Sequence, residues 1–337
     1  MLTIEDIQKY DKGDMHSVYD KWPKLAEQSY ETEYNGIEFK DIDHIVFSGM
    51  GGSGTICDLF SSVLSKTNLH VNVIKGYLLP KTVDNETLVI SISVSGDTAE
   101  TISALKEAKK QHSKIIAFSS GGKMEALCKK NNIEYRKINM FHSPRASFIT
   151  YVYAILKILD SIIPIEKQEI INSIKELKKT SKEISASNLT HTNQAINLAS
   201  WISGIPLIYF PWGLQAAAVR FKNSIQENAK SHAVVENVIE ACHNGIVSWE
   251  KPSNVQPILL QGKDDYFKTK ERWQILKEYF NKNNIPFYEI NSVEGGILSK
   301  LSNLIYFFDY TSIYYAILSK IDPSPIKSID FIKQKLV

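Results

Sequence analysis

The sequence predicts an α/β fold with two doubly wound domains, each built on a mainly parallel sheet with flanking helices. Two observations lead to this prediction. Short apolar runs of strand length alternate with segments of helical length between residues 44 and 163, and the alternation returns, more weakly, after residue 204. The chain of 337 residues is also long enough for two domains of ordinary size.

The first half of the chain carries the clearer alternation. Strands are expected over residues 44–48, 71–74, 88–93, 114–118 and 134–138, and helices over 52–65, 98–111 and 123–130. Polar helices and loops are expected over residues 3–34, and a long apolar helix over 146–163 ends at Pro164. Strands that alternate with helices in this way form a parallel sheet covered on both faces.

The second half repeats the design with altered loops. A charged helix is expected over residues 167–186, a hinge over 187–192, strands over 205–210, 257–261 and 287–290, and helices over 214–228, 268–282 and 299–321. The expected organisation is an N-terminal domain over 1–164, a helical linker over 165–190 and a C-terminal domain over 191–337. The apolar stretch 304–321 contains Asp309 and four tyrosines, so it predicts a buried core helix and not a membrane span.

Composition excludes several classes of protein. With 39 basic and 37 acidic side chains the formal net charge is +2, which gives no electrostatic reason to expect a nucleic acid or an anionic membrane as partner. Three cysteines without a CxxC pair argue against a disulfide framework and favour a reducing cytoplasm. The acidic start of the chain has no pattern of a signal peptide.

Two loops rich in glycine and hydroxyl groups follow two of the expected strands. The first is Gly49-Met-Gly-Gly-Ser-Gly54, and the second is Ser93-Val-Ser-Gly-Asp-Thr98. In an open α/β sheet ligands bind at the carboxyl ends of the strands. Glycines let backbone N–H groups close on an anion, hydroxyls add donors, and a helix N-terminus adds partial positive charge. The loops therefore predict a site for a phosphorylated small molecule.

Other interpretations of the same loops stay open. The first loop matches GxGxxG, which would indicate a dinucleotide, but the next expected strand ends in Lys75 and Gly76 without the acidic residue that binds ribose hydroxyls. Lys75 would instead tolerate a 2′-phosphate. Thr98 is also a suitable N-cap for the helix that follows, and Ser53 is small enough to serve only a tight turn.

Five motifs in order resemble those of a known family. The two loops resemble the sugar-phosphate loops of SIS (sugar isomerase) domains, which implies phosphate contacts from Gly52, Ser53, Ser93, Ser95 and Thr98. Three further stretches are Ser143-Pro-Arg-Ala146, Glu227-Asn-Ala-Lys230 and Ala241-Cys-His-Asn244. Together the five are similar to the bifunctional phosphoglucose/phosphomannose isomerases, known mainly from archaea, over nearly the whole chain.

The resemblance implies a role for four residues. Glu227 would move a proton between C1 and C2 through a cis-enediol, and Arg145 would stabilise the enediolate. His243 would open the sugar ring, and Lys333 on a terminal helix would assist it. Taken alone, each also fits a simpler interpretation: an exposed helix glutamate, a surface arginine, a loop histidine or a solvated lysine.

The implied protein is a cofactor-free cytoplasmic enzyme of glycolysis and gluconeogenesis. It would be a homodimer with the active site at the interface, where the partner subunit supplies the histidine. Asp97 departs from the asparagine usual in the family, so it should point away from phosphate or accept backbone N–H bonds at a helix start. A non-catalytic sugar-phosphate sensor and an NADP-dependent dehydrogenase are the alternatives, and no histidine spacing supports a metal site.

Overall fold

The computed structural model describes residues 2–336, which form two compact units. Unit 2 comprises Lys21–Lys175 and Gly295–Ser299. Unit 1 comprises the described residues up to Asp20, the range Glu176–Glu294, and the described residues from Lys300 onward. The domain boundaries expected from the sequence stay a prediction. The expected domains are continuous ranges of the chain, whereas each compact unit combines separate ranges.

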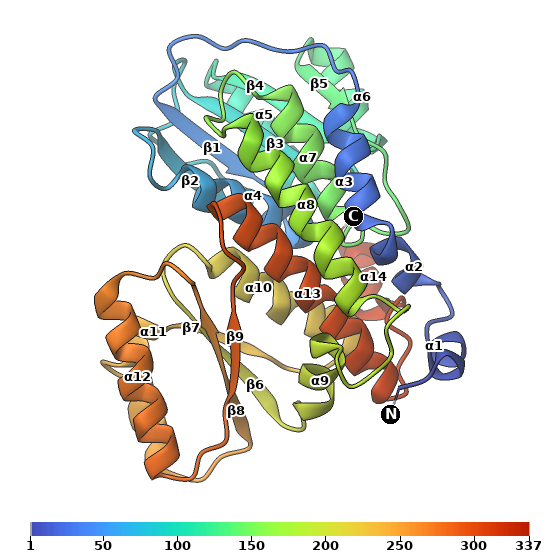
Figure 1. Cartoon of the computed structure of the whole chain (residues 1–337). Helices are drawn as coiled ribbons and strands as arrows, with labels where there is room; N and C mark the ends of the chain where they lie inside the picture. Colours follow the sequence, from blue (N-terminus) through green and yellow to red (C-terminus); the bar gives the residue numbers. More distant parts are fainter. Residues whose placement is uncertain (1, 337) are drawn as a thin grey trace. The chain divides into compact units, whose positions relative to one another are not determined.

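The sheet of unit 2 contains the five strands that the sequence predicted. They are parallel, in the order β2-β1-β3-β4-β5 (Figure 1). Their bounds are β1 His44–Ser48, β2 His70–Ile74, β3 Leu88–Ser93, β4 Lys114–Ser119 and β5 Glu134–Lys137. The chain steps outward from β1 to β2 and then returns to the other side of β1 for β3. The carboxyl ends of β1 and β3 therefore flank the topological switch point of the sheet, where ligands bind in such folds.

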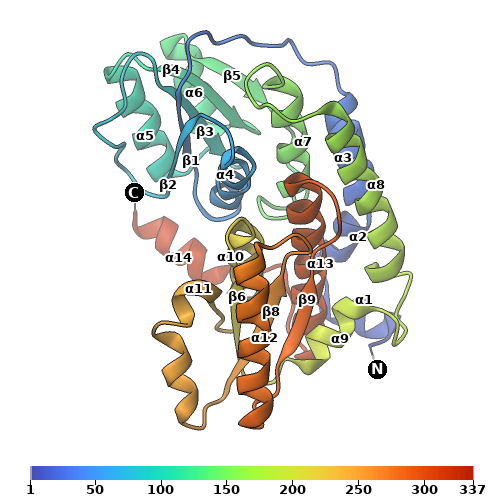
Figure 2. The ribbon, with the colours of Figure 1, turned by 60° about the vertical axis from the view of Figure 1, so that its left-hand side comes forward.

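Helices cover both faces of this sheet. Successive residues of a strand point to opposite faces, and every residue of β1 and β3 is buried, so both faces need a covering layer. Val46 and Val89 pack with Ala104 of α5, whereas Phe47 stacks on Phe60 of α4 with ring centroids 5.7 Å apart. Figure 2 shows α5 on one side of the sheet and α7 on the other. The helices of unit 2 are α3 Trp22–Glu31, α4 Gly51–Leu64, α5 Ala99–Lys110, α6 Gly122–Asn131 and α7 Phe148–Ile158.

The segment before the first strand has more structure than its polarity suggested. Trp22 in α3 is fully buried, its Nε1 donates to the carbonyl of Ala146 at 2.8 Å, and its ring stacks on Phe148 at 6.0 Å. The apolar face of α3 thus packs on α7. The helix expected over 146–163 begins later, at Phe148, because residues 143–147 form a turn.

Unit 1 is built on a second parallel sheet. Its strands are β6 Ile205–Phe210, β7 Val234–Asn237, β8 Val255–Gln261 and β9 Tyr288–Asn291, in the order β7-β6-β8-β9. The first, third and fourth confirm the expected strands. The sequence did not predict β7, which has only four residues and no apolar run of strand length. The α/β class with parallel sheets and flanking helices is confirmed for both units.

The remaining helices either belong to unit 1 or have residues in both units. They are α1 Ile4–Tyr10, α2 Met15–Asp20, α8 Lys167–Ile184, α9 Gln194–Trp201, α10 Gln215–Ser224, α11 Val238–Ala241, α12 Phe267–Lys282, α13 Ile297–Leu318 and α14 Lys327–Lys335. The sequence did not predict α9, which Asn193 caps by accepting from the N–H groups of Ala195 and Ile196. Tyr209 and Phe210 are buried, so they serve the core, whereas Trp212 is 76% exposed.

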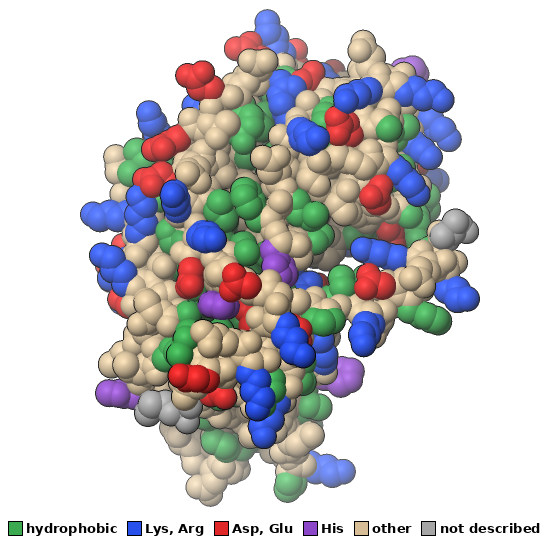
Figure 3. Space-filling model, turned by 90° about the vertical axis from the view of Figure 1, so that its right-hand side faces the viewer, with side chains coloured by type: hydrophobic (Ala, Val, Ile, Leu, Met, Phe, Trp, Pro, Cys, Tyr) green, Lys and Arg blue, Asp and Glu red, His purple; other side chains and the backbone are tan. Residues whose placement is uncertain are grey.

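Basic and acidic side chains are interspersed on the face of the molecule that Figure 3 shows. Over residues 2–336, every helix is too short or too polar to traverse a lipid bilayer. The apolar run that forms α13 is instead a core helix, as expected.

Candidate active site

The two glycine- and hydroxyl-rich loops meet at the switch point of the first sheet. The loop after β1 leads into α4 and the loop after β3 leads into α5. The hydroxyl of Ser53 accepts a hydrogen bond of 3.2 Å from the N–H of Val94, and this bond joins the two loops directly. The prediction that each loop lies at the carboxyl end of a strand is confirmed, and the structure adds that these two strands, β1 and β3, are neighbours in the sheet.

The loop after β1 leaves the start of α4 without a side-chain cap. The N-cap residue Met50 makes no capping bond, and Gly51 has a φ of +54°. A Cβ on Gly49 would lie 3.0 Å from the carbonyl oxygen of Ser53, so the turn closes tightly only with glycine. A helix start of this kind presents N–H groups and partial positive charge to an anion.

The loop after β3 holds its hydroxyls in a small network. The hydroxyls of Ser93 and Thr98 are 2.9 Å apart, and the N–H of Gly96 donates to the Ser93 hydroxyl at 3.1 Å. Thr98 is the N-cap residue of α5, but its side chain makes no capping bond to the helix. Its hydroxyl therefore serves the loop and not the helix. Ser95 is partly exposed, beside the N–H of Asp97.

Asp97 takes the role of a backbone acceptor that was expected for it. Its carboxylate accepts from the N–H of Lys123 at 3.0 Å, in the first turn of α6. Asp97 thus binds the start of α6, and not the start of α5, the helix that directly follows it in the chain. This bond engages one oxygen of the Asp97 carboxylate with the first turn of α6.

Gly96 is required by the packing of its loop on the loop before α6. It has a φ of +77°, and a Cβ at this position would lie 1.8 Å from the carbonyl oxygen of Gly121. Gly96→Ala is therefore expected to lower the free energy of unfolding by about 2–3 kcal/mol, measured by urea denaturation. Gly36→Ala is the control, because no atom lies within 4 Å of its added Cβ. Equal stabilities of the two variants would contradict this account of the loop.

Arg145 lies in the turn between β5 and α7 and belongs to the same unit as the two loops. It is 4% exposed, so it is not the surface arginine of the simpler interpretation. The hydroxyl of Ser147 braces the turn by donating to the carbonyls of Ser143 at 2.9 Å and Phe141 at 3.1 Å. These bonds hold the backbone of the turn on which Arg145 lies.

Glu227 lies within a π-helical turn, Ile225–Ala229, that continues α10. The helix expected over 214–228 is therefore present but changes its winding at the predicted base. Single π turns inside helices are frequent at functional sites, because they rotate the following side chains out of the α-helical register. Asn228 anchors this turn by donating to the Ser312 hydroxyl of α13 at 2.8 Å. Glu227 as a whole residue is half-buried.

A buried ion pair precedes Glu227 on α10, and the sequence analysis did not identify it. Arg220 binds Asp309 of α13 through Nε at 2.9 Å and through Nη2 at 2.6 Å, and Ser224 donates to the same carboxylate at 2.6 Å. Burial by itself would lower the pKa of Arg220, but Asp309 and, more weakly, Glu227 raise it. Both side chains are at most 2% exposed. The sequence signal was a lone aspartate in an apolar helix.

His243 and Lys333 are exposed residues of unit 1. His243 follows α11, and its backbone N–H donates to the carbonyl of Glu240 at 2.9 Å. Lys333 lies on α14, which has no buried residue. The predicted residues thus fall into two sets: the phosphate loops and Arg145 in unit 2, and Glu227, His243 and Lys333 in unit 1.

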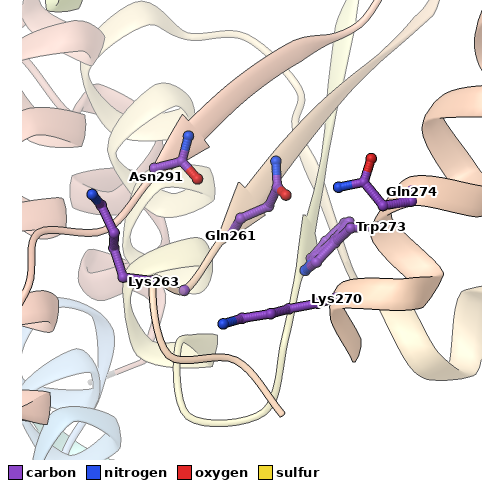
Figure 4. A pocket seen from close by; sticks show the side chains of 7 residues that line it. Gln261, Lys263, Lys270, Trp273, Gln274 and Asn291 are labelled. Carbon is purple, nitrogen blue, oxygen red and sulfur yellow. The ribbon is translucent and has the colours of Figure 1, made fainter. Parts of the chain in front are cut away.

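Unit 1 also has a cleft of about 490 Å³ beside the ends of β8 and β9, which contains none of the predicted residues (Figure 4). Its labelled side chains are Gln261, Lys263, Lys270, Trp273, Gln274 and Asn291. Lys263 lies 3.4 Å from Glu294, and Trp273 donates to Asp265 at 2.9 Å.

The dinucleotide interpretation of the first loop has no structural support at β2. Lys75, which follows this strand, is engaged by Asp58 of α4 at 2.5 Å. It is therefore not held ready for a 2′-phosphate. Within residues 2–336, histidine, cysteine and carboxylate side chains do not gather in groups of three that would hold a metal ion.

The fold and its two loops define the class of the protein, that of the SIS domains. The model of the SIS domain matches residues 38–156, and the model of the bacterial phospho-glucose isomerase C-terminal SIS domain matches residues 191–336. A hypothetical protein of Thermus thermophilus has the same fold, with a TM-score of 0.76 and 12% identity over 98% of this chain and 92% of that one.

Two curated relatives narrow the class to a family. The bifunctional phosphoglucose/phosphomannose isomerase of Caldicellulosiruptor bescii is 33% identical, with 95% of this chain and 98% of the relative covered. That of Aquifex aeolicus is 29% identical, with 90% and 95% covered. The chain belongs to the family of bifunctional phosphoglucose/phosphomannose isomerases.

Proposed function

We propose that this protein is an aldose–ketose isomerase that interconverts glucose 6-phosphate, and also mannose 6-phosphate, with fructose 6-phosphate. The observation that carries the proposal is the pair of loops joined by the bond between Ser53 and Val94 at the switch point of the first sheet. They offer hydroxyls and an uncapped helix start to a phosphate. The reaction itself is inferred from the family to which the chain belongs.

The proposed mechanism assigns one task to each group. Backbone N–H groups at Gly52 and the hydroxyls of Ser53, Ser93, Ser95 and Thr98 hold the phosphate. His243, assisted by Lys333, transfers the protons that open the sugar ring. Glu227 then removes a proton from one carbon of the C1–C2 pair and returns it to the other, while Arg145 balances the charge of the enediolate. The reaction moves a proton and needs no cofactor.

We also propose a cytoplasmic homodimer, serving glycolysis and gluconeogenesis, with the active site at the subunit interface. His243 and Lys333 are both exposed, as a histidine supplied to a neighbouring subunit and a lysine that joins it would be. The thiols of Cys57, Cys128 and Cys242 are free, as in a reducing compartment.

The two alternative functions have less support. An NADP-dependent dehydrogenase would need a group at the end of β2 that binds the adenosine ribose, and Lys75 there is paired with Asp58. A non-catalytic sensor would have no need of a base, yet Glu227 lies in a π turn anchored to α13. A thermal-shift experiment tests the dehydrogenase alternative. We expect 6-phosphogluconate to raise the Tm of the protein and NADP to leave it unchanged.

A coupled assay tests the proposed function directly. The full chain is supplied with fructose 6-phosphate in the presence of a chelator, and the formation of glucose 6-phosphate and of mannose 6-phosphate is followed separately. We expect both products, at a rate that the chelator does not change. Absence of both products would overturn the isomerase function, whereas formation of glucose 6-phosphate alone would remove mannose phosphate from it.

The phosphate site is tested by removing two hydroxyls. Ser53→Ala combined with Ser95→Ala is expected to raise KM for fructose 6-phosphate about tenfold or more, because hydrogen bonds to a charged group are lost. The value of kcat should change much less. Ser65→Ala, at the far end of α4, is the matched control. An unchanged KM in the double variant would place the phosphate elsewhere.

A further inference from the structure

The ammonium group of Lys230 lies in a cage of backbone carbonyl oxygens. Its Nζ donates to the carbonyls of Glu227 at 2.7 Å and Asn228 at 3.2 Å, two residues within the π turn. It also donates to the carbonyls of Asp322 at 3.1 Å and Pro323 at 3.2 Å. One side chain thus joins the turn that carries Glu227 to a segment more than 90 residues further along the chain.

The cage explains the conformation of Lys230. The residue is the C-cap of the π turn and has a φ of +55°, in the left-handed region that favours glycine. The last carbonyls of a helix have no partner within it and attract a cation. A glycine would suit the backbone here, but it could not supply the ammonium group that binds these carbonyls.

The second half of the cage belongs to the connection between α13 and α14. α13 ends at Leu318 and α14, which carries Lys333, begins at Lys327. Within the connection, Pro323 is buried, and the N–H of Ser324 donates to the carboxylate of Asp322 at 2.9 Å. The cage therefore fixes the connection close to its middle, four residues before α14 begins.

We propose that Lys230 is a positioning residue that holds Glu227 and the connection leading to Lys333 in one fixed relation. The proposal rests on the proposed function, since it takes Glu227 as the base and Lys333 as a residue of the site. An ammonium has three protons, and four carbonyls already share those of Lys230. Lys230 is thus committed to the backbone and acts through Glu227 and Lys333, without contact to the substrate.

The test compares three variants of the full chain. Lys230→Met keeps the length of the side chain and removes the charge, Lys230→Arg keeps a charge, and Lys282→Met removes a matched exposed lysine at the end of α12. The readouts are kcat and KM with fructose 6-phosphate, and amide hydrogen exchange over residues 225–230 and 319–326. Exchange over β1 and α4 reports whether unit 2 stays intact.

We expect Lys230→Met to lower kcat about 10- to 100-fold with KM changed by less than about threefold, because a displaced base costs turnover more than binding. Exchange should rise in both segments and stay unchanged in β1 and α4. Lys230→Arg should recover part of kcat, and Lys282→Met should match the unaltered protein.

Two results would overturn the proposal. One is a kcat for Lys230→Met that stays within about threefold of the unaltered protein. The other is a rise of exchange in residues 225–230 alone, which would show that the ammonium does not hold the connection to α14. If the protein has no isomerase activity, the proposed function is refuted. The exchange measurement requires no turnover, so it still decides whether Lys230 joins the two segments.

Discussion

Replacing Glu227 by glutamine is expected to lower kcat for fructose 6-phosphate about 1,000-fold, since general-base catalysis typically contributes roughly 10²–10⁴-fold. Glutamine has nearly the same shape but cannot accept the proton that moves between C1 and C2. The π turn should be retained, because Asn228 and Lys230 anchor it through the bonds to Ser312 and to the carbonyls. Steady-state kinetics of the purified variant give the value.

A measurement of ligand affinity shows whether the Glu227→Gln variant has lost only the base or the whole binding site. The Kd of Glu227→Gln for 6-phosphogluconate, measured by calorimetry, should stay within about threefold of that of the unaltered protein. Glu278→Gln, an exposed residue of α12, is the matched control and should retain full activity. Near-normal turnover in Glu227→Gln would remove Glu227 from the role of base.

The largest effect on stability is expected from Asp309→Ala. This change leaves the guanidinium of Arg220 buried without its carboxylate, and breaking a buried pair from one side typically costs about 3–5 kcal/mol. Ser224→Ala, which removes one hydrogen bond to the same carboxylate, should cost about 1 kcal/mol. Urea denaturation followed by circular dichroism gives both free energies of unfolding.

A double variant shows that the cost comes from the uncompensated charge. Arg220→Met combined with Asp309→Leu replaces the pair by apolar side chains and should recover most of the stability lost in Asp309→Ala. If Asp309→Ala costs less than about 1 kcal/mol, water or another carboxylate must compensate Arg220. If the double variant is as unstable as Asp309→Ala, the loss arises from the packing of α10 on α13 and not from the charge.

Local pattern was sufficient where one element is defined by its own residues. The strands β1, β3 and β6 have the bounds that the sequence predicted, because each is an apolar run between polar or glycine-rich turns. The position of the two phosphate loops followed from the same reasoning. A strand that ends in glycine and serine before a helix places those residues at the ligand-binding edge of any parallel sheet.

Local pattern failed where long-range contacts decide the structure. β7 has four residues and exists because it pairs with β6. The π turn at Glu227 depends on Asn228 bonding to α13, 84 residues away along the chain. None of these partners is visible within a window of neighbouring residues.

By itself, the sequence determined the α/β class and the positions of the two glycine- and hydroxyl-rich loops, because strand runs and glycine turns are local properties of the chain. Only the tertiary structure decided that Ser53 joins the two loops, that Asp97 is held by α6, that Arg220 is paired with Asp309, and that Lys230 gathers carbonyls from two distant segments. Each of these is a contact between residues far apart in the chain, and its energy depends on burial and distance, which spacing along the sequence does not specify.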